Sequence, residues 1–554
     1  MQIWSEGPRP RRQREMIAPS LDEQIGESAG VRFLDELLEQ VDWTEWEDQY
    51  HQSGPGRPTH HPRIMCAAIL YGLMRGMHST RMLEYATHVC QDFQWLLDGR
   101  TIDHSTFAKF RTRHGERLKS LFRQINRKAA QIRRLSLEEV IIDGTRVRAD
   151  SDRMGSRTAG ALERRLTGLE EKMSAALEGL EKAREEGRDD EVDRCERRKQ
   201  VLQGRMKTDE AALAVARERD ALKQAREGLR GSDVRVPVTD PDAHLLPNKE
   251  GGYAPNYTPV IAVEADSGLI VAAQISANNT ETDCMLELVQ ETQECLGAKP
   301  LRLVADEGFG SGHELQSLKA EGIETYIPLG KGPEGNPALR EHPDQPVDCG
   351  DWARLPRRAG KLARAAFVYE SAQDVYYCPM GHKLSAHRKQ SRRSKDGRKV
   401  SIVEYKGAPC QGCALARQCL ARHAQRRVIT RDEYEPCREE ARARMNTARG
   451  REIYARRAPC VEGVFGTIKA AMGVRKFNRR GLVKVREDWM WTCLAFNLKK
   501  MMTWMSEQGG TKPTRAPLRG LLAAFVRSIR LQNTASRLRL CLDRIFPAGE
   551  PKTA

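Results

Sequence analysis

Hydrophobic positions recur with helical spacing from Val31 to about Arg134. VRFLDELLEQV is amphipathic, HHPRIMCAAILYGLMRG is a compact apolar stretch, and Tyr85–Leu97 repeats the helical pattern. Residues 31–134 are therefore predicted to form an all-α domain. Residues 1–30 are polar and irregular, which is typical of a flexible arm, and a basic run in them comprises Arg9, Arg11, Arg12 and Arg14.

The pattern changes to short apolar and β-branched runs after Glu138. Val140-Ile141-Ile142 is the first run, and LRLVADEGFGSGHELQSLKAEGIETYIPL is read as strand, loop, helix and strand, with LRLVA ending at Ala305. Between them, TPVIAVEA and LIVAAQIS are joined by Asp266-Ser267-Gly268, a hairpin turn sequence, and an amphipathic helix is expected from 282 to 296. Residues 135–154, 232–330 and 425–505 are assigned to one α/β domain that two insertions interrupt.

The first insertion, residues 155–231, has a leucine repeat with steps of three and four. Its seam is Leu162, Leu166, Leu169, Met173, Leu177 and Leu180, which is typical of a coiled coil. The pattern breaks near Gly187 and resumes weakly through Val201, Met206, Leu213 and Leu222. An antiparallel helical hairpin is predicted, and a single long helix or a charged spacer remains open.

The second insertion, residues 331–424, carries Cys378 in CPMGH and Cys410, Cys413 and Cys419 in CQGCALARQC. This knuckle-like spacing predicts a small zinc-ribbon-like insert with a closed, structural Zn²⁺ site of four soft ligands. His382 is an alternative to one cysteine as a ligand. Free buried thiols, or a site lost from this chain, are the other interpretations.

The stretch from Tyr454 to Lys500 combines one acidic residue, Glu462, with many basic ones. Val461, Phe465, Ile468 and Met472 share a predicted helix face, and Glu462 and Lys469 lie two helical turns apart. The basic residues are Arg456, Arg457, Arg475, Lys476, Arg479 and Arg480. The pattern fits a metal ion held beside a polyanion, and it also fits a solvated basic helix with one salt bridge. Residues 506–554 are predicted to be a linker and a basic C-terminal helix.

The total charge indicates a large anionic partner. The 554 residues carry a net charge of +16 with a pI of about 9.3, and basic residues recur along most of the chain. Double-stranded nucleic acid is the simplest partner of this kind. No apolar run is long enough to span a bilayer and the N-terminus lacks a signal sequence, so we expect a cytoplasmic protein with reduced cysteines and no membrane partner.

One predicted helix of the N-terminal domain is suited to a DNA groove. Asp103 or Ser105 is the expected N-cap, and Phe107 and Phe110 are expected in the core. The basic residues expected on its outer face, as in a helix-turn-helix, are Lys109, Arg111, Arg113 and Arg117. The alternative is an ordinary helical bundle with a polar surface.

Three carboxylates follow or accompany the predicted strands. Asp143 ends the first apolar run, Asp306 follows the run LRLVA, and Glu462 lies on a helix expected to pack on the same sheet. Asp143-Gly144 alone is equally a turn signal. Glu307 is a second candidate ligand, but neighbours on a strand point to opposite faces.

The order strand, hairpin, helix, strand, helix is that of an RNase H-like fold, a mixed α/β sheet with helices on both faces. Two aspartates and a glutamate that converge there would hold two Mg²⁺ or Mn²⁺ ions for in-line phosphoryl transfer.

At this point the chain resembles bacterial insertion-sequence transposases of the DDE class. The residues that carry the resemblance are IIDGTRVRAD, TDPDA, VEADSGLIV, VADEGFGS, the four cysteines and VEGVFGTIKAAMGVRKFNRRGLVKV with LAFNLKKM. The resemblance implies that Asp143, Asp306 and Glu462 are the catalytic triad. It also matches Tyr454, Arg457 and Lys469 to a tyrosine–arginine–glutamate–lysine signature whose basic members contact DNA. Arg457 precedes Glu462 by five residues, one more than is common, so Arg456 is an alternative.

The resemblance implies a nucleoid-associated enzyme that binds the terminal inverted repeats of its element, cuts DNA and joins it to a target. It further implies a homodimer or larger complex with the two DNA ends. A DNA-binding protein without transposition activity, and a metal-dependent nuclease without strand joining, are the alternatives.

Overall fold

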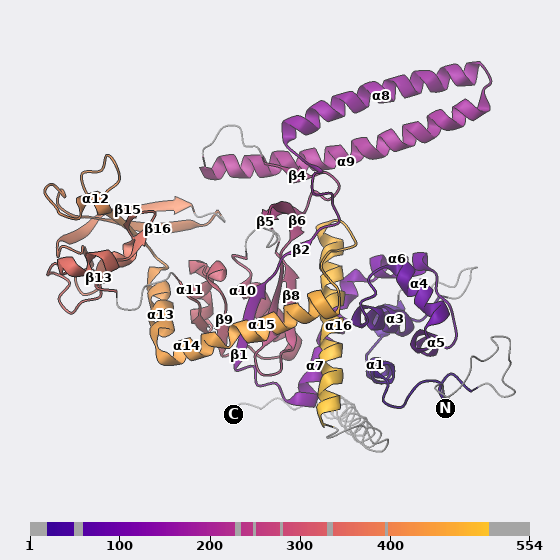
Figure 1. Cartoon of the computed structure of the whole chain (residues 1–554), viewed down its shortest axis with the longest axis horizontal. Helices are drawn as coiled ribbons and strands as arrows, with labels where there is room; N and C mark the ends of the chain where they lie inside the picture. Colours follow the sequence, from indigo (N-terminus) through magenta and orange to yellow (C-terminus); the bar gives the residue numbers. More distant parts are fainter. Residues whose placement is uncertain are drawn as a thin grey trace, which may run out of the picture. The chain divides into compact units, whose positions relative to one another are not determined.

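The computed structural model of the chain describes residues 19–48, 59–227, 234–247, 251–276, 281–329, 336–393 and 397–508 (Figure 1). The predicted basic run of the N-terminal arm and the predicted C-terminal helix lie outside these residues. Contacts divide the chain into two compact units. The helical unit comprises the described residues of Met1–Arg134, Phe465–Arg479 and Val483–Ala554, and the sheet unit comprises those of Leu135–Val464 and Arg480–Leu482.

The helical unit confirms that the N-terminal region is helical, but the single helix expected at Tyr85–Leu97 is divided into two at Cys90, whose backbone is extended. The N-terminal helices are α1 (Gly30–Glu39), α2 (Thr44–Glu47), α3 (Pro62–Met74), α4 (Thr80–Val89), α5 (Gln91–Leu96), α6 (His104–Arg113) and α7 (Leu118–Arg133). α3 starts with Pro62 after a His61 N-cap, and it is buried on nearly all sides, as its uniformly apolar sequence requires. Asp103 is the N-cap of α6 and accepts a hydrogen bond from the Ser105 amide.

The long helix α16 (Leu482–Gln508) differs from the predicted partition, which grouped residues 425–505 with the sheet. In the structure its residues from Val483 onward join the N-terminal helices. Asn497 donates a 2.8 Å hydrogen bond to Asn126 of α7, and the Arg133 guanidinium lies over the Trp504 ring. The reason is apolar burial, because Trp489, Trp491 and Trp504 of α16 are almost completely removed from solvent.

The sheet unit contains a five-stranded mixed sheet in the order β10-β9-β1-β7-β8. β1 (Glu139–Gly144) pairs antiparallel with β7 (Pro259–Glu264), which pairs antiparallel with β8 (Ile270–Ile275). On its other side β1 pairs parallel with β9 (Arg302–Val304), and β9 with β10 (Glu324–Tyr326). The helices α10 (Met285–Leu296) and α11 (Gly312–Ala320) connect β8 to β9 and β9 to β10. The chain is therefore a mixed α/β protein with an N-terminal helical region.

Short strand pairs and 3₁₀ turns complete this region. β2 (Val147–Arg148) and β5 (His244–Pro247) flank β6 (Tyr253–Tyr257), and β3 (Ser156–Arg157) pairs with β4 (Val236–Pro237).

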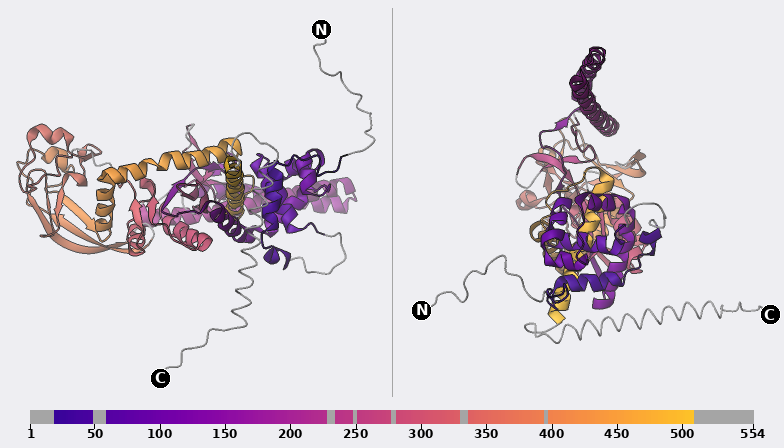
Figure 2. Two further views of the ribbon diagram at one scale, coloured as in Figure 1. Left: turned by 90° about the horizontal axis from the view of Figure 1, so that it is seen from below. Right: turned by 90° about the vertical axis from the view of Figure 1, so that its right-hand side faces the viewer.

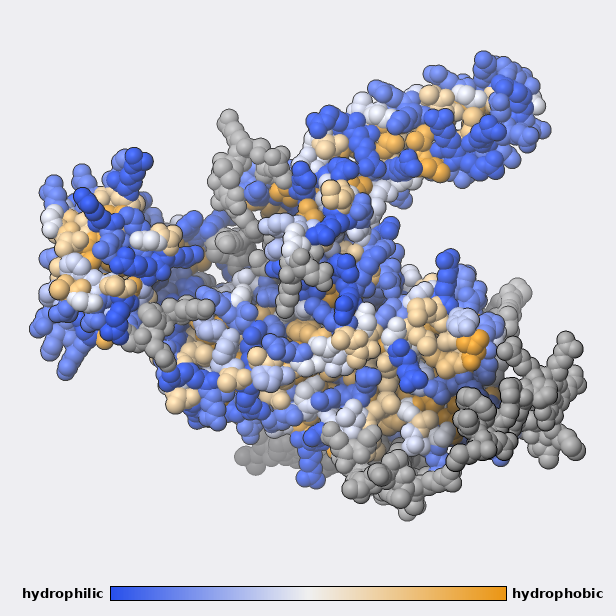
Figure 3. All heavy atoms as spheres, in the orientation of Figure 1, coloured by the Kyte–Doolittle hydropathy of each residue, from blue (hydrophilic) through white to orange (hydrophobic). Residues whose placement is uncertain are grey.

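The first insertion is an antiparallel helical hairpin, as predicted. α8 (Ala159–Glu185) and α9 (Asp189–Glu227) run side by side in the views of Figures 1 and 2, with a turn at Gly187 whose φ is +65°. Figure 3 shows an outer surface that is mainly hydrophilic, with apolar residues gathered between the two helices. The predicted seam is only partly right, since Leu177, Val201 and Leu222 are exposed. Ala176 and Leu202, which adjoin Leu177 and Val201 in the sequence, are buried in the apolar cluster instead.

The second insertion has its own antiparallel sheet in the order β13-β14-β15-β16-β17 and its own apolar core. The strands are β13 (Val368–Glu370), β14 (Val375–Tyr377), β15 (Lys383–Arg393), β16 (Lys399–Lys406) and β17 (Val428–Asp432). Smaller elements are β11 (Arg357–Arg358), β12 (Lys361–Leu362) and α12 (Ala416–Cys419). Because β17 completes the sheet, this Cys-rich lobe extends beyond the predicted boundary at residue 424.

Three consecutive helices lead from the Cys-rich lobe back to the mixed sheet. They are α13 (Glu435–Asn446), α14 (Ala448–Ala455) and α15 (Arg457–Gly466). Glu435 is buried and pairs with Arg364, Arg438 and Arg442, while Arg442 also donates to the carbonyl of Leu329. This network ties α13 both to the lobe and to the chain beyond β10.

Candidate active site

Asp143 and Asp306 lie at the same end of two neighbouring parallel strands. Ile141 of β1 is paired with Val304 of β9, and the same register continued by two residues sets Asp143 beside Asp306. Buried residues on both strands hold this end of the sheet in place. The prediction that each aspartate lies at a strand end is consistent with this register. Asp143 and Gly144 are the last two residues of β1 and do not form a turn.

One guanidinium group bridges the two aspartates. Nη2 of Arg457 lies 2.8 Å from Oδ1 of Asp143 and 3.6 Å from Oδ2 of Asp306. The side chains of Arg457 and Asp143 are only 16% and 17% exposed, so water screens this pair weakly. Burial raises the pKa of Asp143, while Arg457 and the Gly144 amide oppose that shift. Tyr454, one turn before Arg457, is half-buried beside this group, and burial raises its pKa.

Glu281 is a site carboxylate that the sequence patterns did not indicate. It precedes α10, and burial together with the charges of Asp306 and Asp143 raises its pKa to about 7. No periodicity or spacing separates it from other polar residues of the loop before α10. Only the fold brings it close to Asp143 and Asp306.

Glu462 does not join the two aspartates in this structure. Its side chain is exposed on α15, and no hydrogen bond or ion pair engages it among the residues that the structure describes. Among the described residues, Asp143 and Asp306 do not form a group with Glu462, or with Glu281, in which one oxygen atom of each residue lies within 4.8 Å of the others. Glu462 is five residues after Arg457, which places it about 140° around an α-helix from that side chain.

The structure separates the roles of Arg456 and Arg457. Arg456 pairs with Asp266 at 2.5 Å and with Glu139 at 3.5 Å. Asp266 lies in the turn between β7 and β8, and Glu139 begins β1, so Arg456 is at the opposite end of β1 from Asp143. Of the two arginines, Arg457 is therefore the one that lies beside Asp143 and Asp306.

Helix α15 does not continue as an α-helix to Lys469. Thr467–Ala471 form a π-helical turn, which holds more residues than an α turn. The predicted alignment of Glu462 and Lys469 two α turns apart is therefore wrong. Lys469, Arg475 and Lys476 belong to the helical unit, and the Arg475 guanidinium donates to the Lys469 carbonyl.

In α6 the predicted orientation holds for the aromatic residues and fails for one basic residue. Phe107 and Phe110 are buried, and Lys109 and Arg113 are exposed. Arg111, predicted to face outward, is buried and lies 2.8 Å from Asp488 of α16. Asp488 also pairs with Arg479, so Arg111 belongs to a buried ion-pair network within the helical unit.

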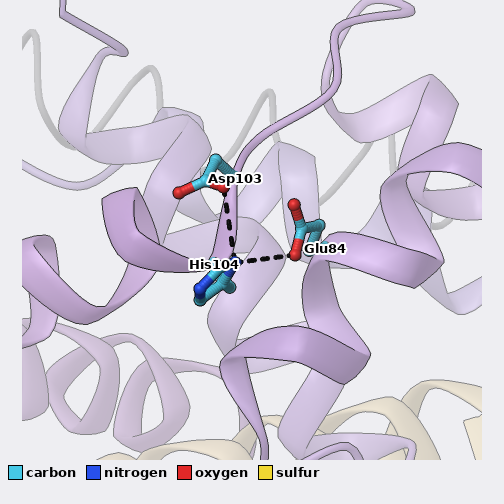
Figure 4. A group of neighbouring side chains, drawn as sticks. All are labelled: Glu84, Asp103 and His104. Carbon is cyan, nitrogen blue, oxygen red and sulfur yellow. Dashed lines mark hydrogen bonds and ion pairs between the residues drawn. The ribbon is translucent and has the colours of Figure 1, made fainter. Parts of the chain in front are cut away.

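A different group of potential metal ligands occurs in the helical unit. Glu84, Asp103 and His104 place one ligand atom each within 4.8 Å of the others, and Figure 4 shows His104 between the two carboxylates. His104 Nδ1 lies 2.9 Å from Glu84 and 3.3 Å from Asp103. All three side chains are at least partly open to solvent, and the pairs connect α4 to the start of α6. This arrangement is accounted for as ion pairing between helices.

The four predicted zinc ligands gather in the Cys-rich lobe. Cys378, Cys410, Cys413 and Cys419 line one cavity of about 340 Å³ together with His382. Two tight turns position them: the Gly381 amide donates to the Cys378 carbonyl, and the Cys413 amide to the Cys410 carbonyl. Burial raises the pKa of Cys419 to about 11, and the other three thiols contribute. No three of these sulfur atoms lie within 4.8 Å, wider than the roughly 3.8 Å between thiolates on one zinc ion.

Two separate parts of the chain match known protein families. Residues 377–502 match the family described as "Transposase DDE domain", and residues 19–113 match "Transposase domain (DUF772)". No curated protein matches the chain. Among solved structures, the chain is similar to a piggyBac transposase in a synaptic complex with hairpin DNA. That alignment has 13% identity and a TM-score of 0.28, and it covers 95% of this chain and 87% of the other.

The chain is therefore a phosphoryl-transfer enzyme. It carries a transposase DDE domain that contains Glu462 and the four cysteines, and an N-terminal transposase domain that contains α6. Transposition-related DNA cleavage and strand transfer are the chemistry of this class, which binds DNA and uses divalent metal ions. None of the helices in the described part of the chain has the length and apolar character needed to cross a membrane.

Proposed function

We propose that the protein is the transposase of a bacterial insertion sequence. It binds the terminal inverted repeats of its element, cleaves at their ends and joins the 3′-hydroxyl groups to target DNA. The observation that carries this proposal is the pair Asp143 and Asp306 at adjacent parallel strand ends with one guanidinium between them. It would work as a homodimer or larger assembly on two DNA ends, in the cytoplasm and on the nucleoid.

The strand order supports an RNase H-like catalytic domain. A central strand with two antiparallel strands on one side and two parallel strands on the other is the arrangement we expect for that fold. The insertion after β3 and the Cys-rich lobe leave this order intact. Catalytic groups collect at the carboxyl ends of parallel strands, which is where Asp143 and Asp306 lie.

The residues present fit divalent metal ions. Asp143 and Asp306 offer hard oxygen ligands, which Mg²⁺ and Mn²⁺ prefer. Their carboxylates are partly desolvated and already attract a positive group, Arg457, which shows that the position favours positive charge. When bound, two such ions would activate the attacking oxygen and stabilise the leaving oxygen of the phosphodiester.

Arg457 and Tyr454 would bind the DNA backbone beside the reacting phosphate. The guanidinium neutralises the aspartates in the free protein, and its buried Nε has no hydrogen-bond partner among the described residues. A DNA phosphate would offer Arg457 a bidentate partner of the geometry that guanidinium groups prefer. Tyr454 packs beside Arg457 and would orient it toward that phosphate.

Glu462 is proposed as the third member of the triad. It shares α15 with Arg457, so rotation of this helix about its axis would carry Glu462 toward the aspartates. The ion pair between Arg457 and Asp143 opposes that rotation, and transfer of Arg457 to a phosphate would remove this opposition.

The exposed basic residues of the helical unit would contact phosphates of the element ends. They are Lys109, Arg113, Arg475 and Lys476, and the half-buried Lys469 would join them. The Cys-rich lobe would hold a structural Zn²⁺ through Cys378, Cys410, Cys413 and Cys419, whose sulfur atoms would close by small movements of two turns. A site with four protein ligands has no open position, so this zinc would stabilise the lobe and take no part in the reaction.

The test uses purified protein, Mg²⁺ and an oligonucleotide bearing the element end. Asp143→Asn, Asp306→Asn and Glu462→Gln should each lower cleavage at least 10³-fold and leave end binding intact. Asp266→Asn is the matched control, since Asp266 pairs with Arg456 at the opposite end of β1. Full cleavage by any triad variant would remove that residue from the triad. Cleavage without joining by the wild type would identify a nuclease.

A further inference from the structure

The loop before α10 brings a third carboxylate to the end of the sheet where Asp143 and Asp306 lie. A Cβ atom built on Gly144 would lie only 2.1 Å from Oε1 of Glu281. A Cβ atom on Gly308 would lie 3.2 Å from the other carboxylate oxygen of Glu281 and 3.0 Å from Asp306. The Glu281 carboxylate therefore spans the space between the residue after Asp143 and the second residue after Asp306.

Both neighbouring positions are glycine, and this leaves the space that the carboxylate fills. Neither Gly144 nor Gly308 has a positive φ, so backbone conformation does not demand glycine at either position. The close approach of Glu281 is the contact that a side chain at Gly144 would disturb.

The fold holds the Glu281 loop in place from the opposite side. Glu314 of α11 is buried and accepts a 3.0 Å hydrogen bond from the Leu286 amide at the start of α10. Ser311, just before α11, donates a 2.8 Å hydrogen bond to Asp283. The loop is thus anchored on the segment that follows Asp306, so Glu281 and Asp306 are positioned by the same part of the chain.

From this placement we infer that Glu281 is a metal ligand of the active site, which binds the divalent cation with Asp143 and Asp306 before Glu462 joins them. The inference rests on the proposed function, because it concerns the same metal site. The cation already seated there, the Arg457 guanidinium, marks the position as one that takes positive charge. Glu462 lies on a different face of α15 from Arg457, whereas Glu281 already lies beside Gly144 and Gly308. The oxygen atoms of Asp143, Asp306 and Glu281 are not all within 4.8 Å of one another in the free protein, so a bound cation would draw the three carboxylates together.

The decisive measurement is the affinity of the full-length protein for Mn²⁺ in the absence of DNA. The electron paramagnetic resonance signal of free Mn²⁺ reports this binding. Glu281→Gln should weaken Mn²⁺ binding at least tenfold, and Asp143→Asn should do the same. Glu462→Gln should change it less than threefold. The matched control is Glu287→Gln, which makes the same substitution at an exposed position of α10.

A second variant tests the geometry without touching a carboxylate. Gly144→Ala should displace Glu281 and weaken Mn²⁺ binding severalfold in the wild type, and it should add little in the Glu281→Gln background, because the two changes act through one contact. Circular dichroism verifies that each variant is folded.

The outcomes distinguish this inference from the proposed function. If Glu281→Gln binds Mn²⁺ like the wild type while Asp143→Asn does not, the inference is overturned and the proposed function stands. If Asp143→Asn and Asp306→Asn retain both Mn²⁺ binding and cleavage, the proposed function itself fails.

Discussion

The Arg457 guanidinium lies 2.8 Å from the Asp143 carboxylate, whereas the preceding residue, Arg456, pairs with residues at the other end of β1. Two adjacent arginines thus pair with carboxylates at opposite ends of one strand. Arg457 supplies positive charge where two carboxylates would otherwise repel each other. Its removal should therefore reveal how strongly that position attracts cations.

Arg457→Ala should make the protein more dependent on divalent cations for its stability. Without the guanidinium, we expect the free energy of unfolding to fall by about 1–3 kcal/mol, as for a charged hydrogen bond in a partly buried site. We also expect Mn²⁺ to raise the Tm of this variant more than it raises the Tm of the wild type. Differential scanning fluorimetry with and without Mn²⁺ measures both. Arg456→Ala is the control and should show the wild-type response to Mn²⁺. Equal responses of the two variants would show that Arg457 does not occupy a cation position.

Arg111 and Lys109, both on α6, should affect different properties. Arg111→Ala leaves Asp488 without one of its partners in a buried network, so we expect a loss of about 3–5 kcal/mol in the free energy of unfolding. Lys109→Ala should leave stability unchanged and reduce the slope of log affinity against log salt by about 1. Urea unfolding followed by tryptophan fluorescence and DNA titrations at several salt concentrations test these outcomes. A stable Arg111→Ala variant with weakened DNA binding would restore the original interpretation of Arg111 as a DNA contact.

The Cys-rich lobe should contain one zinc ion per chain, and its loss should lower Tm. Cys378→Ser and Cys413→Ser should each abolish stoichiometric zinc, whereas Cys349→Ser, an exposed cysteine of the same lobe, should retain it. Burial raises the pKa of Cys378 and Cys419, so protons compete with zinc for these thiols, and zinc should be released more readily as the pH falls. Elemental analysis across a pH series measures this. Metal-free wild-type protein with an unchanged Tm would exclude the zinc site.

Glu314 should lower the stability of the sheet unit as the pH rises. Burial raises its pKa in the folded protein to about 7, above the ordinary value of 4.5. A raised carboxyl pKa means that the folded state binds the proton more tightly than the unfolded state does. The contribution of Glu314 to the free energy of unfolding is therefore largest below pH 4.5 and decreases up to about pH 7. Glu314→Gln should show a smaller decrease than the wild type between these limits. Parallel curves for the two proteins would contradict this role of Glu314.

The N-terminal helices should require α16 to fold. A fragment of residues 19–134 lacks α16, whose own residues Trp489, Trp491 and Trp504 are buried in the full chain. It also lacks the α16 partners of Asn126 and Arg111. We expect this fragment to aggregate or to unfold without cooperativity, and co-expression with residues 465–508 to restore a cooperative transition. Cooperative unfolding of the fragment alone, by circular dichroism, would show that the N-terminal helices form an independent domain.

Local sequence was sufficient for most elements and for some site residues. The run Val140-Ile141-Ile142 predicted β1, Asp266-Ser267-Gly268 predicted the hairpin turn between β7 and β8, and Asp103 predicted the start of α6. These predictions succeeded because each depends on residues within one turn or strand, where side-chain alternation and capping act directly. The cysteine spacing likewise predicted which four thiols come together.

Tertiary structure decided which charged groups meet. Helical periodicity placed Arg111 opposite the aromatic face of α6, but it could not indicate that α16, 377 residues later, covers that face with Asp488. For the same reason nothing in the loop before α10 distinguished Glu281, whose proximity to Asp143 arises from strand register and from Glu314. By itself the sequence determined the strands, the helices and two aspartates at strand ends. The positions of the Arg457 guanidinium between those aspartates and of the Glu281 carboxylate beside them depend on contacts between distant segments. The reason is that charges are stabilised by their neighbours in space, which need not be neighbours along the chain.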